Sequence, residues 1–144
     1  MEKKIILCCL SDFDGTRFKD AAKKKLEAVG YDVVVETWAE NIEDELPHCQ
    51  GIIAFVHLDL GNETYFAIDG LCALSERYDV PIIGIKSNEE TWLSELCWVR
   101  RGVDMLYYDD FVEMNLSPVR LKKTIDEILN EDDRMVGYQS AMIH

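Results

Sequence analysis

The chain has 144 residues, 48% hydrophobic and 30% charged, which fits a single domain with a substantial core. It carries 28 acidic against 15 basic residues, and this excess of negative charge disfavours binding to nucleic acid or to an anionic membrane. No apolar stretch is long enough to span a bilayer and no signal peptide opens the sequence. We therefore expect a soluble, cytoplasmic protein.

The five cysteines do not form a recognisable motif. Their number is odd and they show no C-x-x-C spacing, which argues against a disulfide framework or a zinc site. We expect free thiols, most of them buried, and no metal site. The cysteines are Cys8, Cys9, Cys49, Cys72 and Cys97.

Short apolar runs alternate with helical patterns along the chain. The apolar runs predict strands at residues 5–10, 32–38, 51–58, 81–85 and 103–108. Apolar residues at helical spacing predict helices at residues 17–29, 41–46, 64–78 and 89–100, and a last helix after Ser117. Gly30 and Gly102 are expected to end two of the helices, and Ser117 with Pro118 to begin the last one.

Five successive strand–helix units predict a parallel sheet with helices on both faces. Right-handed crossovers then favour a flavodoxin-like three-layer α/β sandwich with strand order 2-1-3-4-5. We expect one domain over residues 1–130. Residues 131–144 are expected to form a flexible tail, with docking on a partner as the alternative.

In such a sheet, ligands bind at the carboxyl ends of the strands, next to the switch in strand order. The crevice should lie between the first and third strands, where residues 11–16 and 57–64 meet. This rim is acidic, which suits a cationic group or a sugar better than a bare phosphate. The alternative is that several of these acids cap helix N-termini. The acids are Asp12, Asp14, Glu36, Glu40, Asp59, Glu63, Asp109 and Asp110.

The stretch SDFDGT, residues 11–16, resembles the opening motif of haloacid-dehalogenase-like phosphatases. The resemblance implies that Asp12 is a nucleophile and Asp14 an acid/base, with Thr37 and the Asp109–Asp110 pair in the later motifs. That family inserts a hairpin flap after the first strand, whereas here an amphipathic helix begins at about Arg17. The phosphatase is therefore kept as an alternative.

Much of the chain also resembles response-regulator receiver domains. That resemblance implies acids Asp12 and Asp14 after the first strand, a phosphoacceptor Asp59 after the third and Ser87 after the fourth. Receivers place a Lys-Pro pair after the fifth strand, and Asp109 with Asp110 stands there instead. An Asp would repel the phosphoryl group that the Lys holds. The implied protein is a degenerate, non-enzymatic receiver acting through protein contacts.

The middle of the chain, residues 46–85, resembles small Toll/interleukin-receptor-like (TIR-like) domains and the neighbouring nucleoside deoxyribosyltransferases. The matching features in this part are the polar loop DLGNET at residues 59–64 and VPIIGI at residues 80–85. The GYDVV stretch at residues 30–34, which leads into the second strand, also fits. We favour this resemblance. It implies a domain that binds a nucleotide or nucleoside, NAD being one candidate, and that could cleave its N-glycosidic bond; no cofactor is assigned.

Cleavage of that bond builds positive charge on the ribosyl ring, which a carboxylate can stabilise. The candidate catalytic residues are Glu63 and Asp69, although a solvated helix face explains Asp69 equally well. The candidate ligand-binding residues are Ser11, Asp12, Asp14, Trp38, Asp59, Gly61, Asn62 and Tyr65.

The segment from Trp92 to Trp98 contains two tryptophans together with Leu93, Leu96 and, just beyond it, Val99. We expect these side chains to belong to the core. An interface with a protein partner or a second copy is the alternative, because two Trp on a short helix exceed ordinary packing needs.

Overall fold

The computed structural model describes residues 3–11, 16–37, 42–58, 61–112 and 117–130. Its sheet has five parallel strands in the order β2-β1-β3-β4-β5, which confirms the flavodoxin-like fold and the predicted strand order. The strands are β1 (Lys3–Ser11), β2 (Tyr31–Glu36), β3 (Gly51–His57), β4 (Ile82–Lys86) and β5 (Asp104–Tyr107).

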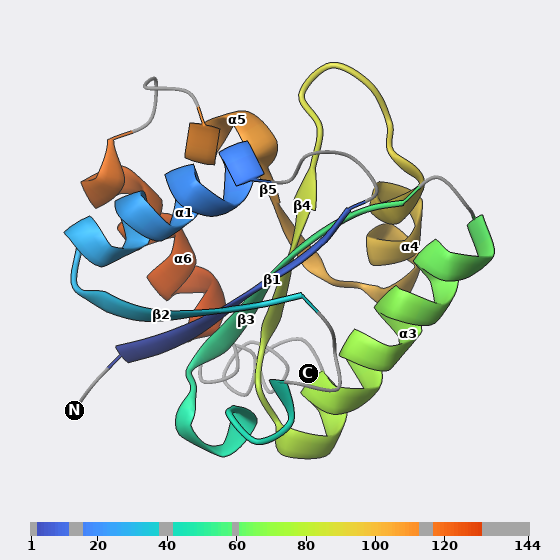
Figure 1. Cartoon of the computed structure of the whole chain (residues 1–144), viewed down its shortest axis with the longest axis horizontal. Helices are drawn as coiled ribbons and strands as arrows, with labels where there is room; N and C mark the ends of the chain where they lie inside the picture. Colours follow the sequence, from blue (N-terminus) through green and yellow to red (C-terminus); the bar gives the residue numbers. More distant parts are fainter. Residues whose placement is uncertain (1–2, 12–15, 38–41, 59–60, 113–116, 131–144) are drawn as a thin grey trace, which may run out of the picture.

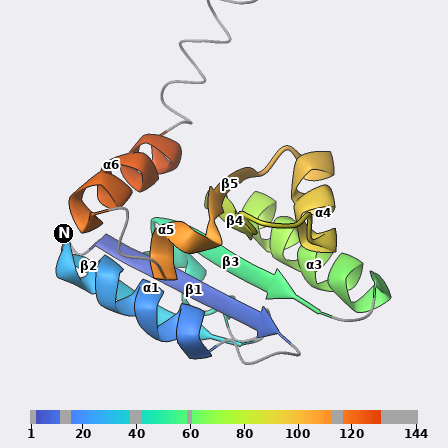
Figure 2. The same cartoon turned by 90° about the horizontal axis from the view of Figure 1, so that it is seen from above.

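Helices cover both faces of the sheet, as Figures 1 and 2 show. One face packs against α1, α5 and α6, and the other against α3 and α4. The described helices are α1 (Thr16–Ala28), the 3₁₀ turn η1 (Leu46–His48), α3 (Gly61–Tyr78), α4 (Leu93–Arg101), α5 (Tyr108–Val112) and α6 (Pro118–Leu129).

The central strand β1 supplies side chains to both layers of the core. Ile5 and Leu7 belong to the cluster under α1, whereas Ile6 and Cys8 belong to the cluster under α3 and α4. Successive residues of a strand point to opposite faces, so a continuous apolar run is what a doubly covered strand requires.

The expected helix ends are found where the sequence places them. Gly30 has φ +99° just after α1, and Gly102 has φ +70° as the C-cap of α4; both are conformations that glycine adopts without steric cost. Ser117 caps α6, because its hydroxyl oxygen accepts a hydrogen bond from the Arg120 N–H.

Two helices differ from their predicted bounds near their N-termini. The helix α3 starts at Gly61 rather than at residue 64, so Glu63 lies in its first turn, where a carboxylate is favourable. The helix α4 starts at Leu93, because residues 88–90 form a bend in which Ser87 Oγ accepts the N–H groups of Glu89 and Glu90. Local hydroxyl bonds of this kind compete with the helix.

Two other elements differ from their predicted bounds. In the segment expected to be an acidic helix, residues 41–46, residue 41 lies outside the described residues, Ile42 is helical, residues 43–45 form a turn, and a 3₁₀ turn that contains Pro47 begins at Leu46. Proline is accepted in a first turn because its missing N–H would be unpaired there. The strand expected over residues 103–108 ends at Tyr107, and the chain continues directly into the short helix α5.

The cysteines are all unpaired, and four of them are buried. Burial raises the pKa of Cys8 and of Cys9 from 9.0 to about 12. In the described part of the chain, no helix is long and apolar enough to cross a membrane.

Candidate functional site at the carboxyl edge of the sheet

The strand ends bring four residues to the carboxyl edge. Ser11 of β1 lies opposite His57 of β3 in the sheet, as the predicted crevice requires. Lys86 of β4 lies opposite Tyr107 of β5, and its ammonium group sits 4.4 Å from the centre of the tyrosine ring. A cation over an aromatic face is attracted to it, so this lysine already has an electrostatic partner.

Aromatic rings occupy the edge between β3 and the start of α4. The ring of His57 stacks on the indole of Trp92, with centroids 4.4 Å apart and planes 20° apart. Trp92 and Tyr108 both make edge contacts in this group, with ring centroids 5.9 Å apart. We call His57, Trp92 and Tyr108 the aromatic cluster. It covers a place where flavodoxin-like sheets bind ligands.

The aromatic cluster continues into the core of the α1 layer. The ring centroid of Phe55 lies 5.7 Å from those of Trp92 and Tyr108. The Phe55 ring also stacks on the ring of Phe18 in α1, with centroids 4.7 Å apart. Phe18 and Phe55 are buried. The rings at the edge are therefore anchored by packing, and a ligand that entered between them would have to separate stacked aromatic groups.

The polar loops at this edge bond to one another. The backbone N–H of Asp109, in the first turn of α5, donates to Asn88 Oδ1 at 3.1 Å. Burial raises the pKa of the Asp110 carboxyl, while the nearby Lys25 opposes that rise. Lys25 donates a hydrogen bond to the Asp110 carbonyl oxygen at 2.8 Å. The position that follows β5 thus presents two carboxyl groups.

Half of the predicted ligand-binding residues cannot be placed. Asp12, Asp14, Trp38 and Asp59 lie outside the described residues. Ser11 is at the end of β1, as expected. Gly61 and Asn62 belong to the first turn of α3 rather than to a polar loop, and Asn62 is exposed.

The two predicted catalytic acids lie on α3, and both are exposed. Asp69 forms an ion pair with Arg101 of α4 and so faces the neighbouring helix. A hollow of about 300 Å³ holds Asp69 with Tyr65, a predicted ligand contact; Cys97, Arg100 and Arg101 complete its lining. Glu63 is not among the residues that line it. The nomination of Glu63 and Asp69 stays a prediction.

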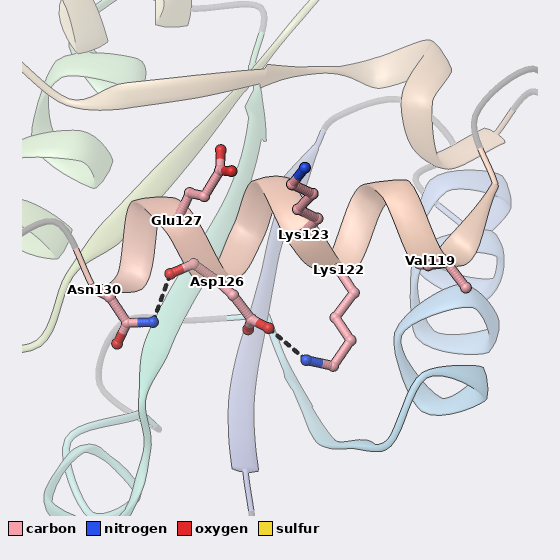
Figure 3. A pocket seen from close by; sticks show the side chains of 6 residues that line it. All are labelled: Val119, Lys122, Lys123, Asp126, Glu127 and Asn130. Atoms are coloured by element: carbon pink, nitrogen blue, oxygen red, sulfur yellow. Dashed lines mark hydrogen bonds and ion pairs between the residues drawn. The ribbon is translucent and has the colours of Figure 1, made fainter.

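A second hollow, of about 510 Å³, lies along the outer side of α6 (Figure 3). It is lined by Val119, Lys122, Lys123, Asp126, Glu127 and Asn130. Lys122 pairs with Asp126 within this set, and Asp126 also accepts a hydrogen bond from Tyr31. Asp126, through Tyr31, holds α6 to β2. Within the described residues, no group of three or more His, Cys, Asp or Glu is placed to hold a metal ion.

Sequence reasoning missed two features of this region. It assigned no role to His57, although a histidine at a strand end was visible in the sequence. Trp92 packs against the core as predicted, but its stack on His57 was not foreseen. It also placed Leu96 and Val99 in the core, and this was wrong: their exposed fractions are 57% and 61%. Trp98, which is fully buried, and Cys97 supply the contact of α4 with the sheet.

Known structures share this fold at low sequence identity. The signal receiver domain of a modulated diguanylate cyclase from Desulfovibrio desulfuricans G20 matches with a TM-score of 0.62 and 16% identity, over 92% of this chain and 98% of that one. The chemotaxis protein CheY4 of Vibrio cholerae matches with a TM-score of 0.58 and 16% identity, over 89% and 99%. A de novo designed Rossmann 2x3 fold protein matches with a TM-score of 0.52 and 19% identity, over 91% of each chain.

No family model matches the sequence, and no curated protein matches it. The solved structures are similar in fold, and several of those that match are described as receiver domains. The match to a designed protein shows that this fold arises without any inherited activity. The chain therefore has a receiver-like flavodoxin fold, and its function has to be argued from its own residues.

Proposed function

We propose that this chain is a receiver-like regulatory domain that acts through protein contacts and is not switched by a phosphoryl group. The observation that carries the proposal is the aromatic cluster, because stacked rings lie at the edge where this fold binds ligands. The similarity of fold to receiver domains is consistent with it.

The charge at the end of β5 supports the same proposal. Asp109 stands where the resemblance to receivers calls for lysine, and its backbone is fixed by Asn88. A carboxylate there would repel a phosphoryl group that a lysine would attract. The nearby Lys86 lies over the Tyr107 ring.

Exposed apolar side chains on and beside α4 supply a surface for such contacts. Leu96 and Val99 project from α4, and Tyr107 is 41% exposed on the neighbouring strand. Tyr107 lies on the α4 side of the sheet. Gly84 of β4 faces Trp98 of α4, and Met105 is its partner on β5. Tyr107 comes two residues after Met105 on the same strand, so its side chain points to the same face of the sheet. Clustered exposed apolar residues mark interaction sites more often than isolated ones do.

Nucleotide or nucleoside binding is the second candidate, and Tyr65 with Asp69 in one hollow is the observation that favours it. Against it, Asp69 is already paired with Arg101, so the charge that should stabilise a cationic transition state is partly neutralised. The hollow also lies between two helices, at Tyr65 and Arg100, rather than among strand ends.

One experiment separates the two candidates. The ¹H–¹⁵N spectrum of the chain is followed during addition of NAD, nucleoside monophosphates and nucleosides, and release of nicotinamide or free base is assayed in parallel. The proposed regulatory domain shows neither binding nor release. Base release that is lost in Glu63→Gln or Asp69→Asn, with the fold retained, would replace it with the enzymatic candidate.

A further inference from the structure

The hollow of about 300 Å³ between α3 and α4 lies apart from the aromatic cluster. Two of its lining residues, Tyr65 and Asp69, come from α3, and three, Cys97, Arg100 and Arg101, come from α4. We call it the α3–α4 hollow. Its volume is at the small end of the range in which proteins bind small molecules, and such sites often lie between helices.

One positive charge in the α3–α4 hollow is already balanced. Arg101 forms an ion pair with Asp69, and this hydrogen bond raises the pKa of Arg101. Glu76, about two turns further along α3, also contributes to the raised pKa of Arg101. An added anion would therefore gain little from Arg101, because carboxylates of the chain already hold its guanidinium group.

Arg100 supplies the charge that is left over. It is exposed, and its guanidinium group takes part in none of the ion pairs or hydrogen bonds within the described part of the chain. Burial raises the pKa of the Cys97 thiol, and the positive charge of Arg100 opposes that rise, so the guanidinium group lies near the thiol that lines the hollow. A planar guanidinium group binds a carboxylate through two parallel hydrogen bonds.

The other lining groups suit an aromatic ring. Tyr65 is 42% exposed, so the face of its ring is open to a ligand in the hollow. Aromatic rings stack on one another, and a sulfur atom such as that of Cys97 makes favourable contacts with ring edges. The hollow thus combines one unpaired positive charge with an aromatic wall.

We infer that the α3–α4 hollow binds a small aromatic carboxylate, with its carboxylate group on Arg100 and its ring against Tyr65. The single unpaired charge favours a monoanion over a phosphate monoester, whose second negative charge would be repelled by Asp69. Such a ligand would bind away from the sheet edge, which goes beyond the proposed function by giving the domain a small-molecule site.

The test is titration of the ¹⁵N-labelled chain with phenylacetate, followed in the ¹H–¹⁵N spectrum. Phenylacetate should bind saturably with a dissociation constant of roughly 1 mM, since a ligand of this size makes few contacts. The largest shifts should come from the residues that line the hollow. Phenylacetamide lacks the charge, acetate lacks the ring and phenyl phosphate carries a second charge, so each should bind at least about tenfold more weakly.

Two pairs of variants test the contacts. Arg100→Gln should weaken phenylacetate binding at least about tenfold, because the charge-assisted hydrogen bonds are lost. Arg120→Gln is the matched control, since Arg120 is equally exposed but lies on α6, and it should bind like the wild type. Tyr65→Ala should weaken binding, whereas Tyr65→Phe keeps the ring and should retain it.

The ion pair with Arg101 gives a test in the opposite direction. Asp69→Asn removes the nearest carboxylate from the Arg101 guanidinium group, so the hollow gains positive charge. Phenylacetate should then bind more tightly than to the wild type, and phenyl phosphate should gain more than phenylacetate because it carries more negative charge. Unchanged or weaker binding of both ligands by Asp69→Asn would overturn the inference.

The wild type and the arginine variants supply the other decisive outcomes. The inference is overturned if phenylacetate causes no saturable shifts up to about 20 mM, if the shifts centre on His57 instead of the hollow, or if phenylacetamide binds as tightly as phenylacetate. Equal affinities of Arg100→Gln and Arg120→Gln would overturn it too. The spectrum of each variant also reports whether the fold is retained, which is expected because all the substituted residues are exposed. None of these outcomes depends on the response to nucleotides, which tests the proposed function.

Discussion

Gly84 of β4 lies directly beneath the indole ring of Trp98 of α4. A Cβ atom at position 84 would lie 2.6 Å from three atoms of that ring, well inside van der Waals contact. The absence of a side chain thus lets a fully buried tryptophan rest on the sheet. This contact fixes α4 on the sheet and leaves Leu96 and Val99 on its outer side.

Replacing Gly84 with Ala should lower the free energy of unfolding by about 1–3 kcal/mol, the usual cost of overpacking a core. Gly70→Ala is the matched control. No atom lies within 4 Å of a Cβ at Gly70, and that residue is in the interior of α3, so alanine should stabilise the helix by about 1 kcal/mol. Urea unfolding of both variants measures the difference. Equal effects would contradict the proposed contact.

The hydroxyl group of Tyr31 donates a hydrogen bond to the carboxylate of Asp126, which ties α6 to β2. Tyr31→Phe should lower the free energy of unfolding by about 1.5–3 kcal/mol, because the acceptor is charged. Tyr78→Phe removes a more exposed hydroxyl bond, to Glu43, and should cost less. Urea unfolding compares the two; a larger loss in Tyr78→Phe would refute the ranking.

The buried thiols predict a loss of stability in alkaline solution. Burial raises the pKa of Cys8 from 9.0 to about 12, so the folded chain holds this proton more tightly than the unfolded chain. The stabilisation is complete below pH 9 and is lost as pH rises toward 12. Burial has the same effect on Cys9. Each thiol adds at most about 1.4 kcal/mol per pH unit to the decrease in the free energy of unfolding.

The measurement is the free energy of unfolding at several pH values between about 9 and 10, in which the tyrosines titrate alike in the wild type and in the Cys8 variant. Cys8→Ala should show a shallower slope than the wild type, whatever its stability at neutral pH. Equal slopes for the two proteins would show that the pKa of the Cys8 thiol does not differ between the folded and the unfolded state, which would contradict the prediction.

The N-cap of α6 gives a fourth prediction. Ser117→Ala removes the hydroxyl oxygen that accepts the Arg120 N–H, and it should destabilise the chain by about 1 kcal/mol. Ser117→Asp keeps an acceptor at the same place and should retain the stability. Thermal unfolding of the two variants decides; a loss in Ser117→Asp as large as in the alanine variant would exclude capping as the reason.

The fold could be predicted from the sequence because its signals are local. The apolar run of β1, the glycines that end α1 and α4, and the Ser117–Pro118 start of α6 each have one physical interpretation. The helix boundaries were predicted less well where polar side chains form hydrogen bonds with the nearby backbone that compete with the helix. Ser87 draws the next residues into a bend, and the helix of Tyr108–Val112 begins without a break in the sequence pattern.

The site could be predicted only in its location. Parallel strands must end at one edge, so Ser11 opposite His57 followed from the strand order. The aromatic cluster did not follow, because a stack of His57 on Trp92 joins residues from different elements. The exposure of Leu96 and Val99 was likewise hidden, since helical periodicity does not say which of two apolar stripes faces the sheet.

The proposed function is tested most directly by its response to a phosphoryl mimic. Mg²⁺ and beryllofluoride are added to the ¹⁵N-labelled chain, and the ¹H–¹⁵N spectrum is recorded at increasing concentration. We predict a spectrum without saturable changes, since Asp109 occupies the position of the lysine that would hold the mimic. Stoichiometric, Mg²⁺-dependent shifts spreading from the residues around His57 and Ser87 would contradict the account and identify a domain that phosphorylation switches.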